Sequence, residues 1–445
     1  MSQGLIRFIT AGSVDDGKST LIGRMLFDSK VVLADQLLAV SKTKYARVTS
    51  SDAAIDLALL TDGLEAEREQ GITIDVAYRY FATAKRKFIV ADAPGHEQYT
   101  RNLVTGASQS DVAVILIDAT RVDLSTTPPT LLDQTKRHSA IVKLLGIRHM
   151  IFAINKMDLM GFDEVVFQQI ETAIQDLKNT LSLGEIQLIP MSALLGDNVV
   201  RRSDQMPWYS GPTFIEYLED LDISQDSYLT GLRLPVQYVA RQDGSANEDF
   251  RGYLGRIESG KIQKGQTIQV LPSGHEAKVT EIHVGNDHAN NISENSSVQA
   301  VAGQVVTICL DRDVDISRGD MIVELINPSS IDTSQPHLAK NIVADICWLD
   351  QDALSLARKY ILRHTTNQVF TKIKSIETVL DVKTLSHGSQ TNHMKMNDIG
   401  KVQLTLQKPI VTDTFLQNSL TGAFVLIDES SNHTVAAGMI REILL

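Results

Sequence analysis

The chain has 445 residues, of which 43% are hydrophobic and 22% charged, and its formal net charge is -12. This composition is ordinary for a globular protein with substantial cores, and the length predicts about two to four domains. The acidic balance disfavours non-specific nucleic-acid binding, which depends on clustered Lys and Arg.

The N-terminal residues enter an apolar strand pattern at once, which does not fit a signal peptide. No apolar run reaches the roughly 18 residues of a membrane-spanning helix, so we expect no membrane span and a cytoplasmic location. The two cysteines, Cys309 and Cys347, have no paired spacing. We expect them to be buried small apolar residues, not a zinc site or a disulfide framework.

The first motif follows an apolar run that begins at Leu5, and it reads Gly12-Ser-Val-Asp-Asp-Gly17-Lys18-Ser19. This is G-x-x-x-x-G-K-[ST] between a strand and a helix, the context that separates a phosphate-binding loop from a glycine-containing turn. The glycines let consecutive N–H groups curl around a phosphate, and the helix start presents more of them. Lys18 is predicted to contact the terminal phosphates and Ser19 to ligate Mg²⁺.

A long segment, Asp28 to Ala84, follows the loop and contains Gly71-Ile72-Thr73-Ile74. The charged stretch before Gly71 predicts a helix, whose charges equally suit a solvated face. Thr73 could reach Mg²⁺ and the γ-phosphate and release when that phosphate leaves.

Four continuous apolar runs predict buried strands of a parallel sheet, separated by helical segments. The runs are Phe88–Ala91, Val112–Ile117, Met150–Ile154 and Gln187–Pro190. Ligands of such sheets bind beyond the carboxyl ends of the strands, and each run here is followed by a polar motif.

Two of these motifs are informative in combination. Asp92-Ala93-Pro94-Gly95-His96 contains D-x-x-G, in which the carboxylate holds Mg²⁺ through water and the glycine N–H meets a phosphate. Asn155-Lys156-Met157-Asp158 is N-K-x-D, and its Asp158 carboxylate can accept two hydrogen bonds from guanine but not from adenine. Alone, the first also suits a common turn and the second a helix cap.

The fourth run leads to Ser192-Ala193-Leu194, whose backbone is expected to close over the base. Because these motifs occur in order at successive strand ends, the N-terminal half is predicted to be an α/β P-loop GTPase domain with a mostly parallel sheet. Beyond about residue 229, short strand patterns alternate with Gly-containing turns, which indicates all-β barrels or sandwiches. We predict a GTP-binding domain over residues 1–224 and two β-barrel domains over 229–326 and 338–445.

The motifs resemble those of the translational-type GTPases, the group that contains elongation factor Tu. Over the whole chain the sequence is more similar to the GTPase subunit family of bacterial sulfate adenylyltransferase. Segments that carry this resemblance include Gly12–Thr20, Asp56–Tyr80, Pro94–Asn102, Met206–Pro212 and Leu420–Asp428. Elongation factors typically have His at the positions of Ser13 and Asp16.

The resemblance implies a role for each matching position. Lys18, Thr73 and His96 would act in hydrolysis, with His96 positioning the attacking water behind an apolar gate of Val14 and Ile72. Ser19 and Thr73 would ligate Mg²⁺, with Asp92 holding it through water, and Asp15 can hold a monovalent cation such as K⁺. The residues expected to bind the nucleotide are Gly12, Ser13, Val14, Asp15, Asp16, Gly17, Lys18, Ser19, Thr20, Asp92, Ala93, Pro94, Gly95, His96, Asn155, Lys156, Met157, Asp158, Ser192, Ala193 and Leu194.

The resemblance also implies a function in sulfate assimilation. GTP hydrolysis would drive the formation of adenylylsulfate and pyrophosphate from ATP and sulfate, with adenylyl transfer on a smaller catalytic partner subunit. An elongation-factor-like carrier of aminoacyl-tRNA is the alternative, opposed by the acidic balance and the loop variants Ser13 and Asp16. A GTPase that acts only as a scaffold is a third possibility.

One segment departs from the family pattern. Residues Thr120 to Asp133, which include Pro128-Pro129, intervene before Gln134-Thr-Lys-Arg-His138. The two prolines predict an extended surface loop. We expect it to affect partner docking and not GTP chemistry.

Overall fold

The computed structural model describes residues 4–28, 75–96, 99–223, 231–242, 250–285, 297–325, 335–381, 383–388 and 393–444. The chain divides into two compact units, residues 1–222 with 381–386 and residues 223–380 with 387–445. None of the described helices combines the length and the apolarity needed to cross a lipid bilayer.

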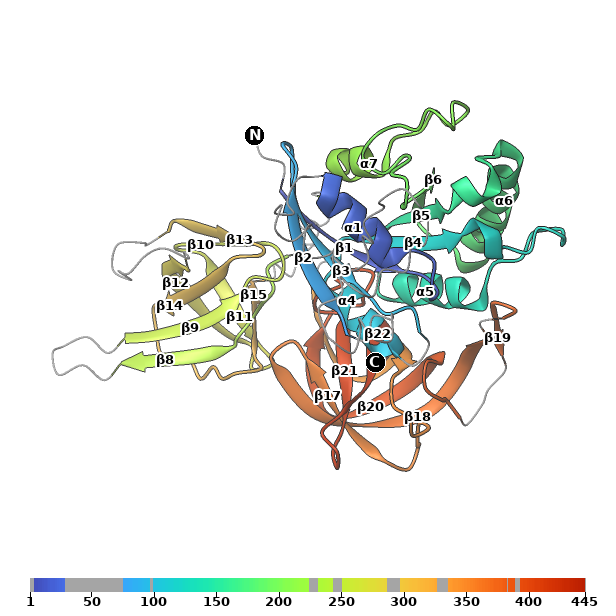
Figure 1. Ribbon diagram of the computed structural model, residues 1–445. Helices are drawn as coiled ribbons and strands as arrows, with labels where there is room; N and C mark the ends of the chain where they lie inside the picture. Colours follow the sequence, from blue (N-terminus) through green and yellow to red (C-terminus); the bar gives the residue numbers. More distant parts are fainter. Residues whose placement is uncertain are drawn as a thin grey trace. The chain divides into compact units, whose positions relative to one another are not determined.

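The first unit is built on a six-stranded sheet with the order β2-β3-β1-β4-β5-β6. Its strands are β1 (Leu5–Ala11), β2 (Ala77–Ala82), β3 (Lys87–Asp92), β4 (Val112–Asp118), β5 (His149–Asn155) and β6 (Glu185–Pro190). Only β2 pairs antiparallel, and the other pairings are parallel. Figure 1 shows the helices of this unit around the sheet: α1 (Lys18–Asp28), α4 (Thr100–Ala107), α5 (Asp133–Leu144), α6 (Glu164–Leu181) and α7 (Phe214–Asp220).

The apolar runs of the sequence explain this sheet. All seven residues of β4 are buried, as are six of the seven in β5, because helices cover a parallel sheet on both faces. The four predicted runs lie within β3, β4, β5 and β6, so the prediction of parallel strands is confirmed. Each of these strands ends at the residue where a polar motif begins or within two residues of it.

The first part of the second unit is an antiparallel sheet with the order β7-β15-β11-β12-β14-β9-β8, accompanied by the pair β10-β13. The strands are β7 (Leu234–Pro235), β8 (Tyr238–Gln242), β9 (Phe250–Arg256), β10 (Lys261–Gln263), β11 (Thr267–Leu271), β12 (His275–Val284), β13 (Gln299–Val301), β14 (Val305–Leu310) and β15 (Met321–Glu324). Strands β13 and β14 are separated by a turn at Gly303, which has a φ of 89°. Buried residues alternate with exposed ones along these strands and form one hydrophobic core.

The second part of this unit is a closed barrel. Its strands are β16 (His337–Trp348), β17 (Lys359–His364), β18 (Asn367–Asp381), β20 (Ile399–Thr412), β21 (Ala423–Asp428) and β22 (Thr434–Leu444), with β19 (Ser386–Gly388) added beside β18. The pairing of β17 with β18 closes the six strands. The barrel has its own hydrophobic core, in which Trp348 and Tyr360 meet edge to face with centroids 5.8 Å apart.

A buried ion pair joins the two β structures of the second unit. The Arg233 guanidinium, just before β7, donates from Nη2 to Asp413 Oδ1 at 2.8 Å and from Nε to Oδ2 at 3.0 Å. Arg233 is 1% exposed and Asp413 2%. The α/β unit followed by all-β structure confirms the predicted fold class. The bounds of the three predicted domains remain a prediction.

Candidate nucleotide site

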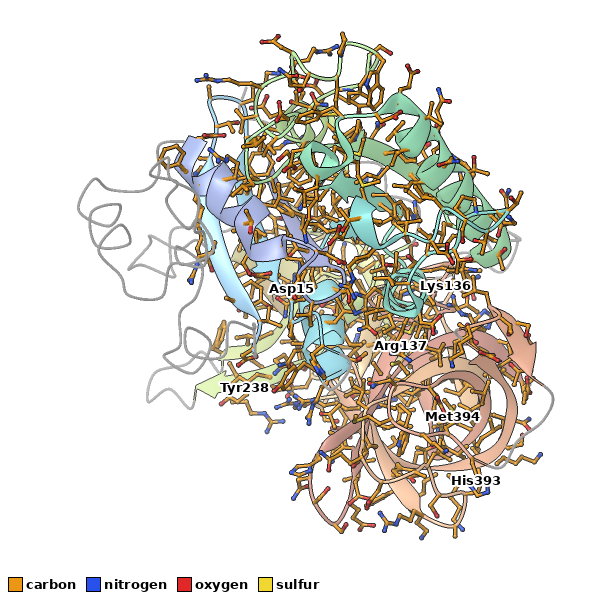
Figure 2. The ribbon with its side chains drawn as sticks, turned by 45° about the vertical axis from the view of Figure 1, so that its right-hand side comes forward. Asp15, Lys136, Arg137, Tyr238, His393 and Met394 are labelled. Atoms are coloured by element: carbon orange, nitrogen blue, oxygen red, sulfur yellow. The ribbon has the colours of Figure 1, made fainter. Side chains whose placement is uncertain are left out.

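The predicted phosphate loop connects β1 to α1 and has a tightly curled backbone. Gly12 and Gly17 have φ values of 147° and 93°, which residues with a side chain rarely adopt. A Cβ atom on Gly12 would lie 2.8 Å from the Leu116 carbonyl oxygen, and one on Gly17 would overlap the Asn155 amide. Figure 2 shows Asp15 in this loop beside the beginning of α1, where its side chain is exposed. The loop geometry therefore depends on the two glycines that the motif specifies.

Lys18 is folded onto the loop. Its ammonium donates to the Ser13 carbonyl oxygen at 2.6 Å and to the Gly12 carbonyl oxygen at 3.3 Å. Burial lowers the pKa of Lys18, and the carboxylates of Asp16 and Asp92 oppose this effect. Among the described residues the Lys18 ammonium donates hydrogen bonds to neutral carbonyls, with the carboxylates of Asp15, Asp16 and Asp92 nearby, so it is well placed to receive an anionic ligand.

The D-x-x-G loop lies against the phosphate loop. The Ser19 hydroxyl donates to Asp92 Oδ2 at 3.2 Å, and the Thr10 hydroxyl donates to Asp92 Oδ1 at 2.9 Å. A Cβ atom on Gly95 would lie 2.8 Å from the backbone C of Ser13 and the backbone N of Val14, so only a glycine allows this close approach to the loop. Ala93, Pro94 and Gly95 are buried, so the D-x-x-G motif is packed against the phosphate loop and is not a solvent-exposed turn.

Asn155 connects two other parts of the site. Its side-chain nitrogen donates to the Asp16 carbonyl oxygen at 2.8 Å, and its side-chain oxygen accepts the Ala193 N–H at 2.8 Å. The N-K-x-D motif therefore holds the phosphate loop and the Ser192-Ala193-Leu194 loop together. Asp158 is half-buried in the short helix that follows (Met157–Met160), and Met157 N–H donates to the Met191 carbonyl oxygen at 3.2 Å.

Lys156 adopts a left-handed backbone with a φ of 63° and extends its side chain to the end of β4. Its ammonium lies 2.6 Å from Asp118 Oδ2. Burial acts to raise the pKa of Asp118, but hydrogen bonds from Lys156 and Thr120 outweigh it and the pKa is lowered. Asp118 therefore stays ionised and fixes the stem of Lys156, a role that the sequence analysis did not assign.

Further supporting residues come from α5. The Gly12 N–H donates to His138 Nδ1 at 3.0 Å, and His138 Nε2 lies 2.8 Å from the Gln134 amide nitrogen, which also donates to the Gly95 carbonyl oxygen at 3.3 Å. Burial, together with nearby Lys18, lowers the pKa of His138 to about 3, so its imidazole is neutral. The segment Gln134–His138 stood out in the sequence, but only its position beside both loops gives it a role.

Two arginines were also missed. The Arg24 guanidinium on α1 donates to the carbonyl oxygens of Ala193 and Leu194. Arg121 Nη1 donates to the Val14 carbonyl oxygen at 2.8 Å and lies 3.6 Å from the buried carboxylate of Asp16. Arg121 belongs to residues Thr120–Asp133, the segment that departs from the family pattern. The beginning of this segment therefore contacts the phosphate loop, although the sequence predicted an extended surface loop.

Of the residues predicted for hydrolysis, Lys18 belongs to the phosphate loop, and His96 follows the D-x-x-G motif. His96 is exposed, and its ring packs edge to face against Tyr99 with centroids 6.2 Å apart. Thr73 and Ile72 lie outside the described residues. Within the described part of the chain, hydrogen bonds link the phosphate loop to Asp92, Asn155 and α5, and none of these bonds involves His96.

Comparisons with known proteins agree with this geometry. Residues 3–229 match the model of the elongation factor Tu GTP binding domain, and residues 341–441 match a GTP-eEF1A C-terminal domain-like model. The solved GTPase-like domain of S. cerevisiae Ski7, bound to GTP, has the same fold, with a TM-score of 0.51 and 19% identity over 99% of this chain and 98% of that one. Fold and site together define a GTP-binding protein of the elongation factor Tu class.

Curated relatives define the family more narrowly. The chain is 46% identical to sulfate adenylyltransferase subunit 1 of Aliarcobacter butzleri, over 98% of this chain and 87% of that protein. It is 47% identical to the bifunctional enzyme NodQ of Rhizobium sp. (strain N33), over 98% of this chain but only 63% of the longer enzyme. The chain belongs to the sulfate adenylyltransferase subunit 1 family.

Proposed function

We propose that this protein binds GTP with Mg²⁺ and hydrolyses it as the GTPase subunit of a sulfate adenylyltransferase. The observation that carries the proposal is the convergence of the phosphate loop, Asp92-Ala-Pro-Gly95, Asn155–Asp158 and Ser192–Leu194 at one edge of a parallel sheet. Identity above 40% to subunit 1 proteins along nearly the whole chain supports the pathway assignment.

Guanine and phosphate are recognised at opposite ends of this edge in the proposal. The Asp158 carboxylate accepts two hydrogen bonds from guanine, while Lys156, held by Asp118, lies along the base. At the other end Lys18 leaves the carbonyls of Gly12 and Ser13 and binds the terminal phosphates. The crowding around Gly12, Gly17 and Gly95 supports this assignment, because any side chain there would fill the cradle.

A magnesium ion fits the donor set beside the phosphate loop. The Ser19 hydroxyl and the Asp92 carboxylate lie 3.2 Å apart, and hard oxygen donors of this kind are what Mg²⁺ prefers. Ser19 and Thr73 would hold the ion directly and Asp92 through water. When bound, Mg²⁺ neutralises charge on the phosphates.

Hydrolysis is then a matter of positioning and charge stabilisation. In the proposal His96 orients the attacking water, the N–H of Gly95 and the ammonium of Lys18 stabilise charge on the γ-phosphate, and Val14 with Ile72 screens His96 from the nucleotide before activation. Asp15, exposed at the loop, is proposed to hold a monovalent cation such as K⁺.

The proposed partner is a smaller catalytic subunit that transfers the adenylyl group from ATP to sulfate, with both subunits in the cytoplasm. Adenylylsulfate formation is strongly uphill, so GTP hydrolysis by this chain would supply the driving force. No membrane or nucleic-acid partner is proposed.

The test measures GTP turnover by this chain, alone and with the smaller sulfate adenylyltransferase subunit of the same cell, while adenylylsulfate is followed with ATP and sulfate present. We expect the partner to raise GTP turnover and adenylylsulfate to accumulate only while GTP lasts. Lys18→Ala serves as the nucleotide-free control and should lose both signals. If the partner changes neither signal for the natural protein, the GTPase assignment is retained and the sulfate pathway is abandoned.

A further inference from the structure

Strand pairing in the first β structure of the second unit collects three metal-binding side chains, Glu281, His283 and Cys309. Glu281 and His283 are two residues apart on β12, and Cys309 lies on the neighbouring strand β14, where it pairs directly with Glu281. Their ligand atoms all lie within 4.8 Å of one another. Residues far apart in the sequence therefore form one compact cluster.

The backbone fixes the cluster on the outer face of the sheet. Ile282 on β12 and Ile308 on β14 are both fully buried in the core. Because successive side chains of a strand point to opposite faces, their neighbours Glu281, His283 and Cys309 must point outward together. The register of β12 against β14 shifts between Val279 and Glu281, and this irregularity sets which residues of β12 face Cys309.

The two ring nitrogens of His283 have different surroundings. Its Nε2 lies 3.1 Å from Glu281 Oε2, and its Nδ1 is buried with no hydrogen-bond partner among the described residues. A buried ring nitrogen without a partner is unfavourable, and a neutral imidazole can offer the lone pair of its unprotonated nitrogen to a metal ion. The histidine side chain is 17% exposed, so a small ion can reach it from solvent.

Cys309 corrects the expectation from sequence that both cysteines are buried apolar residues. Cys347 is buried, as expected, but Cys309 is only partly buried and faces a carboxylate and an imidazole. Burial, with a further contribution from Glu281, raises the pKa of Cys309, which disfavours the free thiolate. A metal ion that takes Cys309 as a ligand must therefore displace the thiol proton.

We propose that Glu281, His283 and Cys309 form a binding site for Zn²⁺. Thiolate, imidazole and carboxylate are the three ligand types that zinc uses in proteins, at about 2.3, 2.0 and 2.1 Å. Donors around a tetrahedral zinc ion therefore lie about 3.3–3.7 Å apart, which small side-chain rotations of this cluster can reach. Mg²⁺ and Ca²⁺ prefer all-oxygen sites, so this site is chemically distinct from the magnesium position at Ser19 and Asp92.

The three side chains leave one position of a tetrahedral zinc ion for water or another ligand. Zinc with three protein ligands is more exchangeable than zinc in a closed four-ligand site, and its ligands lie on two strands that are already paired. Binding should therefore stabilise the second unit by linkage without being required for its folding.

The test uses Co²⁺ as a spectroscopic substitute for zinc. The full-length protein is first saturated with Mg²⁺ and GDP, so that the nucleotide site does not take up the added ion, and Co²⁺ is then titrated. We expect one equivalent to bind with a thiolate-to-cobalt charge-transfer band in the near ultraviolet, and Zn²⁺ to abolish the band by displacement. The chain has two cysteines, so the band can come only from Cys309 or Cys347.

Variants identify the ligands. Cys309→Ser should lose the band and Cys347→Ala should keep it. Mutation of residues that only support the metal ligands costs roughly 10–100-fold in affinity, so His283→Asn, which removes a ligand, should weaken Zn²⁺ binding by more than this. His275→Asn, on the same strand and exposed, should leave the affinity unchanged. Zn²⁺ should also slow modification of Cys309 by a thiol reagent in the unaltered protein, a readout that requires no variant.

Absence of a charge-transfer band, a band that persists in Cys309→Ser, or equal rates of Cys309 modification with and without Zn²⁺ would each overturn the proposal. Equal losses of affinity in His283→Asn and His275→Asn would also exclude this cluster as the site.

Discussion

Replacing Asn155 by Ala should destabilise the first unit, in addition to any effect on guanine recognition. The amide side chain makes two hydrogen bonds of 2.8 Å, one to the Asp16 carbonyl oxygen and one from the Ala193 N–H. Asp16, Asn155 and Ala193 are each no more than 3% exposed, so water cannot replace the lost partner without rearrangement. Leaving a buried polar group unsatisfied costs about 1–3 kcal/mol, which predicts a loss of about 2–6 kcal/mol for the two groups together.

The measurement is urea unfolding of the nucleotide-free protein, followed by tryptophan fluorescence. The chain has two tryptophans, and Trp348→Phe in every sample leaves Trp208 as a reporter of the first unit. Trp208 Nε1 donates to the Phe162 carbonyl oxygen at 3.0 Å and its ring packs on Phe167, so its emission should change when this unit unfolds.

The matched control is Leu159→Ala, four residues further on, where the side chain is 66% exposed and the change should stay within about 0.5 kcal/mol. If Asn155→Ala lowers the free energy of unfolding by less than about 1 kcal/mol, Asn155 does not hold the two loops together in the way described. Retention of full guanine nucleotide affinity in this variant would likewise contradict the connection between the two loops.

Other predictions concern charge and chemistry. Burial raises the pKa of Asp16 from 3.8 to about 6, so the ionised carboxylate destabilises the folded protein above pH 6, and this cost disappears as the pH falls toward 4. Asp16→Asn should therefore stabilise the nucleotide-free protein by up to about 3 kcal/mol at pH 7. A stability difference between the two proteins that does not depend on pH would refute this. Asp158→Asn should shift preference from GTP toward xanthosine triphosphate in competition binding, and unchanged selectivity would remove Asp158 from the base site. His96→Ala should slow single-turnover GTP hydrolysis with GTP affinity preserved, and undiminished hydrolysis would rule out its role in positioning water. Asp413→Ala should lower the unfolding free energy of the second unit by about 3–5 kcal/mol, since it leaves the Arg233 charge buried, whereas a loss below 1 kcal/mol would show that the ion pair is solvated.

The contacts of the phosphate loop explain why its composition differs from the elongation-factor pattern without loss of the fold. Asp16 accepts the Ser13 N–H at 2.5 Å and faces Arg121, so an aspartate and an arginine occupy the space beside the loop. The arginine comes from the segment that departs from the family pattern. The loop variant and the departing segment therefore belong to one local arrangement.

Much of this protein is determined locally by its sequence. The apolar runs of β3 to β6 can be stable only as strands covered on both faces, and G-x-x-x-x-G-K-[ST] requires the positive φ angles found at Gly12 and Gly17. Because parallel strands present their carboxyl ends at one edge, the convergence of the D-x-x-G and N-K-x-D motifs also follows from the order of the elements.

The tertiary structure alone decided the contacts between residues that no motif connects. His138 on α5 accepts the Gly12 N–H, and its neutral state depends on burial beside Lys18, neither of which local periodicity encodes. Cys309 carried no paired spacing, yet the register of β12 and β14 places it opposite Glu281 and beside His283. Sequence patterns specify which face of a strand a side chain occupies, but the partner across the sheet is set by pairing and register, which depend on packing of the whole core.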